Sequence, residues 1–429
     1  MVSLSQVPTP RAASDRAVAE DLDRSDQLAV YRERFVSPDP TLVYLDGNSL
    51  GRLPVTTAQR VAEAVTEQWG SGLIRSWENW IDLAQSIGDE IAAGVLEADP
   101  GEVVLSDSTT VNLYKLAAAA LDARPDRHVL LTDDDNFPTD SYVFQGLTAA
   151  RGLELRVIET DLDAGLSTEA VQAAMDEDVA LASFSHVAYR SGAIADMVAI
   201  TGIAHDSGAL TLWDLSHSGG SIPVPLRSAG ADLAVGCTYK YLCGGPGAPA
   251  YLYVRKDRQG ELRQPIWGWF GQRDQFAMTG QYDAAPGLAR FLVGTPPVLS
   301  MIGVREGVAI VAEAGISALR TKGQALTSYL IDLADEWLTP LGFLLASPRD
   351  VERRGSHVTL HHPQAWQICR ALIERYDVVP DFRTPDRLRL GPAPLTTSFA
   401  DVWEGLDRLR RLVEAGVHES YPAQRSRVT

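Results

Sequence analysis

Two residues in the middle of the chain have the types and the spacing that a pyridine-containing cofactor requires. Asp214 ends the apolar run ALTLWD, and Lys240 follows the next apolar run, DLAVGC. In an α/β sheet, ligands gather beyond the carboxyl ends of the strands, where both residues would lie. Pyridoxal phosphate needs a lysine for its Schiff base and a carboxylate that keeps its pyridine nitrogen protonated. We therefore expect Lys240 and Asp214 to hold pyridoxal phosphate.

Each of these two residues also has a simpler interpretation. Asp214 could cap a loop, and Lys240 could be a solvated lysine on the surface. The segment around Lys240, GCTYKYLCGGPGAPAYLYV, is however apolar and rich in glycine, so a solvated lysine is out of place there. This context and the strand spacing together favour the cofactor-binding role.

The phosphate of such a cofactor needs backbone N–H groups at the start of a helix, together with hydroxyl groups. Ser108, Thr109 and Thr110 supply them, because they precede the strongly helical pattern VNLYKLAAAAL. Ordinary capping of that helix explains the same three residues, and the two roles are compatible. We expect the phosphate to lie at this helix start.

The segment NFPTD follows the next apolar run along the chain. Within it, Phe137 could lie over the cofactor ring, and Asp140 could accept a hydrogen bond near the ring hydroxyl. Taken alone, NFPTD is only a turn. Its place after a predicted strand makes both residues candidates for the same site.

The elements that must position these residues follow from the apolar pattern. Between residues 102 and 254, short apolar runs such as EVVLSDS, HVLLTDD and VALASFSHV alternate with amphipathic segments of helix length. This alternation predicts an α/β fold with a mostly parallel sheet covered on both faces. Residues 55–98 are predicted to be helical from apolar positions three and four residues apart.

The chain divides into three predicted segments. Residues 1–54 form an N-terminal arm and the start of a small-domain segment, and residues 55–310 form a large cofactor-binding domain. Residues 311–429 form a connecting helix and a small C-terminal α/β domain. The Gly- and Pro-rich tract from Gly268 to Pro297 is predicted to be an extended crossing.

The composition narrows the classes of protein and partner. The 429 residues are 45% hydrophobic and 22% charged, which suits a soluble globular enzyme, and the net charge of −18 argues against nucleic acid or an anionic membrane as a partner. No apolar run is long enough to span a membrane, and the N-terminus lacks the apolar core of a signal peptide. Three scattered cysteines indicate reduced thiols in the cytoplasm, and the histidines show no metal-binding spacing.

A family resemblance then emerges from eight segments, which occur in the family's order. The chain resembles kynureninases in YLDGNSLGRLP (44–54), GLIRSW (72–77), DSTTVN (107–112), NFPTD (136–140), WDLSHS (213–218), YKYLCGGPGAPA (239–250), GWFG (268–271) and GTPPVLS (294–300). The resemblance implies a pyridoxal-phosphate enzyme of fold type I. It also implies hydrolysis of the Cβ–Cγ bond of L-kynurenine or 3-hydroxy-L-kynurenine, giving an anthranilate and L-alanine in the kynurenine pathway.

The resemblance also implies roles for individual residues. Lys240 would carry the Schiff base, and Tyr239 would reach the phosphate and act as an acid–base group. The cofactor would further contact Thr109, Thr110, Phe137, Asp140, Ser185, Asp214 and His217. Trp269 and Thr295 would complete the phosphate site of a neighbouring subunit, which implies a homodimer with shared active sites. The substrate would contact Arg389 through its α-carboxylate, and Ser49 and Trp77 near its aryl end.

Three departures from the family pattern leave the aryl substrate open. Cys243 stands where asparagine is usual, Ala188 replaces a polar residue, and Gln272 follows GWFG where histidine is usual. One alternative is therefore an enzyme for a ring-substituted kynurenine in secondary metabolism. Another is a class V relative such as a cysteine desulfurase, although no cysteine lies in a predicted exposed loop. A non-catalytic protein of the same fold is the third, and the joint presence of Asp214, Lys240 and Arg389 argues against it.

Overall fold

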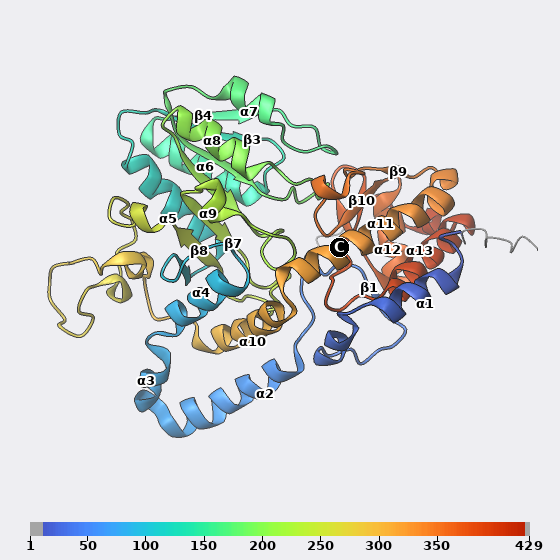
Figure 1. Ribbon diagram of the computed structural model, residues 1–429, viewed down its shortest axis with the longest axis horizontal. Coiled ribbons are helices and arrows are strands. Elements are labelled where there is room, and N and C mark those ends of the chain that lie inside the picture. Colours follow the sequence, from blue (N-terminus) through green and yellow to red (C-terminus); the bar gives the residue numbers. More distant parts are fainter. Residues whose placement is uncertain (1–11, 425–429) are drawn as a thin grey trace, which may run out of the picture.

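The computed structural model describes residues 12–424, so the first part of the predicted N-terminal arm lies outside the described residues. The larger part of the molecule is built on a seven-stranded sheet (Figure 1). Its strands, in spatial order, are β2 (Val103–Leu105), β8 (Tyr251–Val254), β7 (Leu233–Gly236), β6 (Leu210–Asp214), β5 (Val179–Ser185), β3 (Val129–Asp133) and β4 (Glu154–Ile158). Strand β8 runs antiparallel to its neighbours β2 and β7, and the other pairs are parallel.

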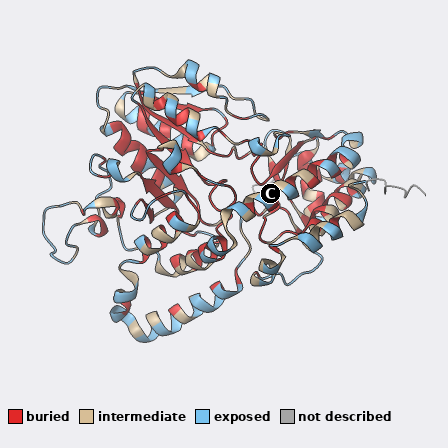
Figure 2. Cartoon of the chain, viewed as in Figure 1, coloured by how far each residue is buried: buried red, intermediate tan, exposed pale blue. Residues whose placement is uncertain are grey.

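The sheet forms because its strands are short apolar runs that helices cover. Every residue of β2, β3, β6, β7 and β8 is buried, as expected for strands enclosed on both faces. Figure 2 shows this buried core within the helices. The helices that pack around it are α4 (Leu83–Gly94), α5 (Thr109–Asp122), α6 (Pro138–Arg151), α7 (Thr168–Ala174), α8 (Met197–Asp206), α9 (Leu226–Ala229) and α10 (Val298–Ala314). The predicted α/β class with a mostly parallel sheet is confirmed.

One of these helices, α6, was not predicted from the sequence, where NFPTD indicated only a turn. The helix begins with Pro138 at its first position, carries Asp140 in its first turn and ends at Gly152 in the left-handed conformation. These are ordinary start and stop signals. The turn predicted at NFPTD is therefore the start of α6. This helix start brings Phe137 and Asp140 to the edge of the sheet.

The predicted helical region from 55 to 98 is broken into pieces. Helix α2 (Val55–Glu63) continues into wider turns that end at Gly72, and the short α3 (Trp77–Trp80) leads to α4. In Figure 1, α2 and the turns after it lie along the edge of the molecule, away from the sheet. Several large apolar side chains are exposed there, including Trp69 at 58% and Ile74 at 75%.

A second, smaller part has its own buried core. Its antiparallel sheet has the order β12 (Asp381–Arg383), β13 (Arg387–Leu390), β10 (Val358–His361) and β9 (Leu344–Leu345). Strand β1 (Val43–Tyr44) pairs with β11 (Val378–Val379) beside it. The helices of this part are α1 (Arg16–Ser25), α11 (Ile316–Leu333), α12 (Ala365–Arg375) and α13 (Phe399–Glu414).

The N-terminal segment belongs structurally to the smaller part, because α1 packs against α13 and β1 pairs with β11. The predicted limit at 310/311 falls inside α10, which packs against α2 and α4 of the larger part. The exact domain limits stay a prediction. None of the described helices is long and apolar enough to cross a membrane.

Candidate active site

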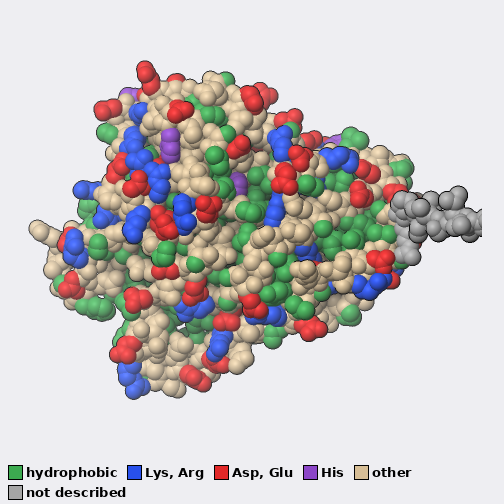
Figure 3. All heavy atoms as spheres, viewed as in Figure 1, with side chains coloured by type: hydrophobic (Ala, Val, Ile, Leu, Met, Phe, Trp, Pro, Cys, Tyr) green, Lys and Arg blue, Asp and Glu red, His purple; other side chains and the backbone are tan. Residues whose placement is uncertain are grey.

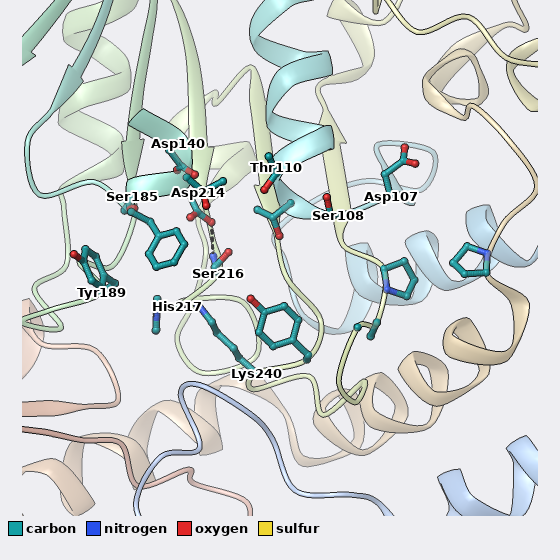
Figure 4. A pocket seen from close by; sticks show the side chains of 18 residues that line it. Asp107, Ser108, Thr110, Asp140, Ser185, Tyr189, Asp214, Ser216, His217 and Lys240 are labelled. Carbon is teal, nitrogen blue, oxygen red and sulfur yellow. Dashed lines mark hydrogen bonds between the residues drawn. The ribbon is translucent and has the colours of Figure 1, made fainter. Parts of the chain in front are cut away.

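A cavity of about 430 Å³ opens at the carboxyl ends of the central strands, a volume suited to a small ligand. It brings together nine residues singled out from the sequence (Figure 4): Thr109, Thr110, Phe137, Asp140, Ser185, Asp214, His217, Tyr239 and Lys240. They come from β5, β6 and the turn after it, the starts of α5 and α6, and the turn after β7. The sheet therefore gathers side chains that are far apart in the sequence at one edge.

Lys240 is buried, at 9% exposure, and its amine points into the cavity. Its Nζ lies 2.9 Å from Nε2 of His217. Burial and the charge of Lys240 hold the pKa of His217 well below its usual value, so this imidazole is neutral. A neutral ring can accept a hydrogen bond from the ammonium through Nε2. The lysine is thus the accessible amine of the cavity and is oriented by one histidine.

Two buried carboxyl groups face the same space. Asp214, at the end of β6, accepts a hydrogen bond of 2.8 Å from the backbone N–H of Ser216. Burial raises the pKa of Asp214, and Ser216 and the charge of Lys240 oppose the rise. Burial, and then the charge of Asp214, raise the pKa of Asp140 well above its usual value. A cationic group bound in the cavity would relieve this unfavourable burial.

The start of α5 forms the opposite end of the cavity in Figure 4, where Ser108 and Thr110 lie. Ser108 caps the helix by accepting a hydrogen bond of 3.4 Å from Val111 N. Thr109 and Thr110, the first two residues of the 14-residue helix, line the cavity beside Ser108. The predicted capping is confirmed, and it leaves this helix start available for the predicted phosphate.

Aromatic rings form another wall of the cavity. Phe137 packs edge to face on Tyr189, with 5.3 Å between the ring centroids. The Nζ atom of Lys240 lies 6.0 Å from the centroid of Phe137 and 5.9 Å from that of Tyr239. The hydroxyl of Ser185 donates to the side-chain oxygen of Asn136 at 2.7 Å. A flat ring could therefore fit beside Phe137, close to the lysine.

Arg389 comes from β13 of the smaller part and does not line the cavity itself. It is fully buried, at 1% exposure. Its guanidinium donates to the Tyr189 carbonyl and to the Ser49 hydroxyl, both at 2.7 Å, and it pairs with Asp381. Since Tyr189 lines the cavity, Arg389 lies just behind that wall. Ser49, which was expected near the aryl end of the substrate, lies instead beside the arginine expected to hold the carboxylate.

The three remaining predicted residues, Trp77, Trp269 and Thr295, do not line the cavity of their own chain. Trp77 lies 6.3 Å from Trp269 and 5.9 Å from Phe270, measured between ring centroids. Thr295 is exposed. Trp269 and Thr295 of the predicted crossing segment therefore lie outside the cavity that Lys240 lines, although Pro297 of the same segment lines it.

One of the three departures has a backbone consequence. Cys243 has a φ of 53°, in the left-handed region that asparagine adopts more readily than cysteine. The asparagine usual in the family thus suits the backbone of this turn. The side chain of Gln272 accepts a hydrogen bond of 2.6 Å from Asp283 N, and Ala188 N donates to the Ala193 carbonyl at 2.8 Å.

Three further residues belong to this region and were not singled out from the sequence. Tyr189 and Ser216 line the cavity, and His357 approaches it from the smaller part, 5.4 Å from His217 between ring centroids. Tyr189 and Ser216 follow β5 and β6, so the rule that ligands gather at carboxyl strand ends could have found them. His357 precedes β10 in the other sheet, and no sequence signal connects it to the site.

The cavity fits pyridoxal phosphate. Buried Asp140 Oδ2 and His217 Nδ1 have no hydrogen-bond partner among residues 12–424, although almost all buried polar groups have one. Asp214 could pair with a protonated ring nitrogen, Lys240 could hold the aldehyde carbon, and the start of α5 could bind the phosphate. Asp214 and Lys240 thus suit the pyridine ring of this cofactor and its aldehyde, and the start of α5 suits its phosphate.

Comparison with known proteins agrees with this chemistry. The family described as the kynureninase C-terminal domain matches residues 319–409. Kynureninase of Pseudomonas fluorescens is 41% identical over 401 residues, which cover 92% of this chain and 94% of that protein. Kynureninase of Burkholderia pseudomallei (strain 1106a) is 43% identical over 407 residues, covering 93% of this chain and 95% of that protein.

Solved structures share the fold at much lower identity. A cysteine desulfurase from Thermococcus onnurineus NA1 superposes with a TM-score of 0.77 at 19% identity, covering 90% of this chain and 98% of that chain. A cysteine desulfurase from Escherichia coli gives a TM-score of 0.77 at 16% identity, covering 91% and 99%. These structures establish the fold, which is fold type I of the pyridoxal-phosphate enzymes. The extent and identity of the sequence matches establish the closer relationship: the chain belongs to the kynureninase family.

Proposed function

We propose that this protein uses pyridoxal phosphate to hydrolyse the Cβ–Cγ bond of L-kynurenine, 3-hydroxy-L-kynurenine or both, giving an anthranilate and L-alanine. One observation carries the proposal. Lys240, Asp214 and the start of α5 line a single cavity in a chain of the kynureninase family. When bound, the cofactor supplies an electron-accepting ring that stabilises negative charge on the carbon atoms of the substrate.

The residues of the chain would then share the work as follows. Asp214 would hold a proton on the ring nitrogen, because a buried carboxylate pairs strongly with a cation. The Nζ atom of Lys240 would hold the cofactor and would also take the proton from the substrate α-carbon. Neutral His217 accepts a hydrogen bond from this amine and keeps it directed into the cavity.

Two other residues would act on the substrate itself. The Arg389 guanidinium would hold the α-carboxylate. Its Nε has no partner among residues 12–424, and its terminal nitrogens would exchange a bond to Ser49, Asp381 or the Tyr189 carbonyl for the substrate. The Tyr239 hydroxyl would move a proton to or from the water that adds to the γ-carbonyl group. Burial raises the pKa of Tyr239, so its hydroxyl stays protonated and can donate.

Steady-state turnover on L-kynurenine and 3-hydroxy-L-kynurenine, measured side by side, tests this function. We expect both anthranilate release and alanine formation with at least one of the two substrates. If both substrates are turned over, their kcat/KM values would show which of the two the enzyme prefers. A protein that binds pyridoxal phosphate and turns over neither substrate would contradict the proposal and would favour a ring-substituted kynurenine.

The desulfurase alternative is not favoured, although the solved structures named above include desulfurases. That reaction needs a nucleophilic cysteine that can reach the substrate. All three cysteines of this chain, Cys237, Cys243 and Cys369, are buried, and burial raises the pKa of each thiol. Free buried thiols also suit our further proposal that the protein acts in the cytoplasm.

We propose, further, that two copies of the chain share their active sites. Trp269 and Thr295 lie outside the cavity of their own chain, and the same segment exposes Phe276 at 67% and Met278 at 75%. Exposed apolar residues of this size suit burial against a second copy. The surface visible in Figure 3 mixes acidic and basic side chains, which suits a small-molecule enzyme better than a nucleic-acid-binding protein.

Complementation between two inactive variants is the expected result of such sharing. One variant would be Lys240→Ala, and the other Trp269→Ala combined with Thr295→Ala. A mixed dimer contains one site with Lys240 from one copy and Trp269 and Thr295 from the other. Coexpression should therefore restore about a quarter of wild-type kcat, since half of the dimers are mixed and each has one complete site. Absence of recovery in isolated mixed dimers would contradict shared sites.

A further inference from the structure

Lys115, in the second turn of α5, is an ammonium group with no access to solvent. Lysine is almost never fully buried unless its charge is paired. Its Nζ donates to Ser106 Oγ at 2.9 Å, to Asp107 Oδ2 at 2.7 Å and to the Phe291 carbonyl at 2.8 Å. All three N–H groups of the ammonium therefore have acceptors, and the lysine is fixed in one position.

Two of these acceptors form the turn that leads from β2 into the start of α5. Asp107 has a φ of 44°, a left-handed conformation that costs energy for residues other than glycine. The Ser106 hydroxyl donates to the same carboxylate oxygen at 2.7 Å, and the Asn112 amide donates to the Ser106 carbonyl at 2.6 Å. A buried polar network centred on Lys115 thus holds the turn whose next residues line the cavity.

The third acceptor comes from a distant part of the chain. Phe291 ends the short helical turn Gly287–Phe291 in the crossing segment. This segment continues to Thr295 and then to Pro297, which lines the cavity. One ammonium group therefore joins the phosphate end of the cavity to the segment that carries Thr295.

The charge of Lys115 also favours binding of an anion such as the cofactor phosphate. Asp107 lines the cavity next to Ser108, at the end where the phosphate would lie (Figure 4). A carboxylate without a counter-charge at this place would repel a phosphate dianion. Burial lowers the pKa of Lys115, and the adjacent Asp107 carboxylate opposes this effect and so favours the charged ammonium.

We propose that Lys115 is a positioning residue for the phosphate of the cofactor. It holds the Ser106–Asp107 turn in its strained conformation and neutralises Asp107, so that the start of α5 accepts a dianion. It acts through these two residues and touches neither cofactor nor substrate. The inference rests on the proposed function only in taking the phosphate to be that of pyridoxal phosphate.

The dissociation constants of pyridoxal phosphate and of pyridoxal, which lacks the phosphate, test this role. Both would be measured on apoenzyme of the wild-type chain and of Lys115→Met, from the absorbance of the Lys240-bound cofactor. We expect the Kd of pyridoxal phosphate to rise about 10- to 100-fold in the variant, as for other residues that support a ligand indirectly. Pyridoxal should bind as it does to the wild-type chain.

The double variant Lys115→Met with Asp107→Asn is the matched control, because it also removes the carboxylate. We expect it to recover part of the lost affinity for pyridoxal phosphate. An equal loss of affinity for both ligands would mean a general structural role and would overturn the proposal. Unchanged binding of pyridoxal phosphate to Lys115→Met would overturn it as well.

If Lys115→Met does not fold, a comparison of Asp107→Asn with the double variant still tests the role of Lys115. Asparagine tolerates the left-handed conformation, and Asp107→Asn keeps the ammonium. We then expect Asp107→Asn to bind pyridoxal phosphate about tenfold more tightly than the double variant, with equal binding of pyridoxal. Equal binding of pyridoxal phosphate by these two variants would contradict the role. A wild-type chain that binds no pyridoxal phosphate would instead contradict the proposed function.

Discussion

Lys240→Ala is expected to abolish the absorbance band of the lysine-bound cofactor and to lower kcat by about 10²- to 10⁴-fold or more. Lys240 Nζ is the amine that points into the cavity, 2.9 Å from His217 Nε2. Its loss removes both the covalent attachment of the cofactor and the base that takes the α-proton. Absorbance spectra of the purified variant with added pyridoxal phosphate, followed by single-turnover kinetics, check both effects.

Lys256→Ala is a suitable control for this change. Lys256 is exposed in the turn after β8, outside the cavity, so its replacement should leave both the band and the turnover intact. If the band survived in Lys240→Ala, the cofactor would be attached elsewhere, and the assignment of Lys240 would be wrong.

Asp214→Asn should lower kcat by about 10²- to 10³-fold while the band of the bound cofactor remains. The amide is nearly isosteric and can still accept the hydrogen bond from Ser216 N. It cannot supply the negative charge that keeps the pyridine nitrogen protonated, so the ring accepts electrons less well. Turnover on kynurenine, compared with the spectrum of the same preparation, measures the two effects separately.

Asp232→Asn separates this effect from the mere loss of a buried carboxylate. Asp232 is also fully buried, but it lies at the opposite end of the sheet, where it pairs with His205, Arg255 and Arg258. Its replacement should destabilise the fold, because it removes the charge that three partly buried side chains share, and should spare kcat of the folded protein. Equal kcat losses in the two variants would contradict a specific role for Asp214.

The larger fold could be predicted because its signals are local. Six strands of the seven-stranded sheet are short apolar runs, the edge strand β4 (ELRVI) being the exception, and α5, α7 and α8 are segments of helix length. Helix α6 was missed because its start coincides with a turn motif, NFPTD. The wide turns after α2 begin within the first of the two predicted helical segments and end at Gly72, where Gly70 and Gly72 disfavour a helix.

The candidate site could be predicted to the extent that its residues follow strands. Asp214 and Ser185 end β6 and β5, so the parallel topology alone brings them to one edge. Contacts between the two parts of the molecule could not be predicted in this way. The bond between Arg389 and the Tyr189 carbonyl, and the approach of His357 to His217, depend on how two separate sheets pack. The roles of individual residues remain predictions until the variants are measured.

The burial of every thiol in the chain has a practical consequence for spectroscopy. Because Cys237, Cys243 and Cys369 are enclosed, maleimide dyes should leave the folded wild-type protein unlabelled. One cysteine introduced on the exposed face of α12 and one on that of α2 would then each accept a fluorophore without prior removal of the native thiols. Energy transfer between two such dyes could follow whether β13, which carries Arg389, moves toward the sheet that carries Lys240 when an amino acid binds.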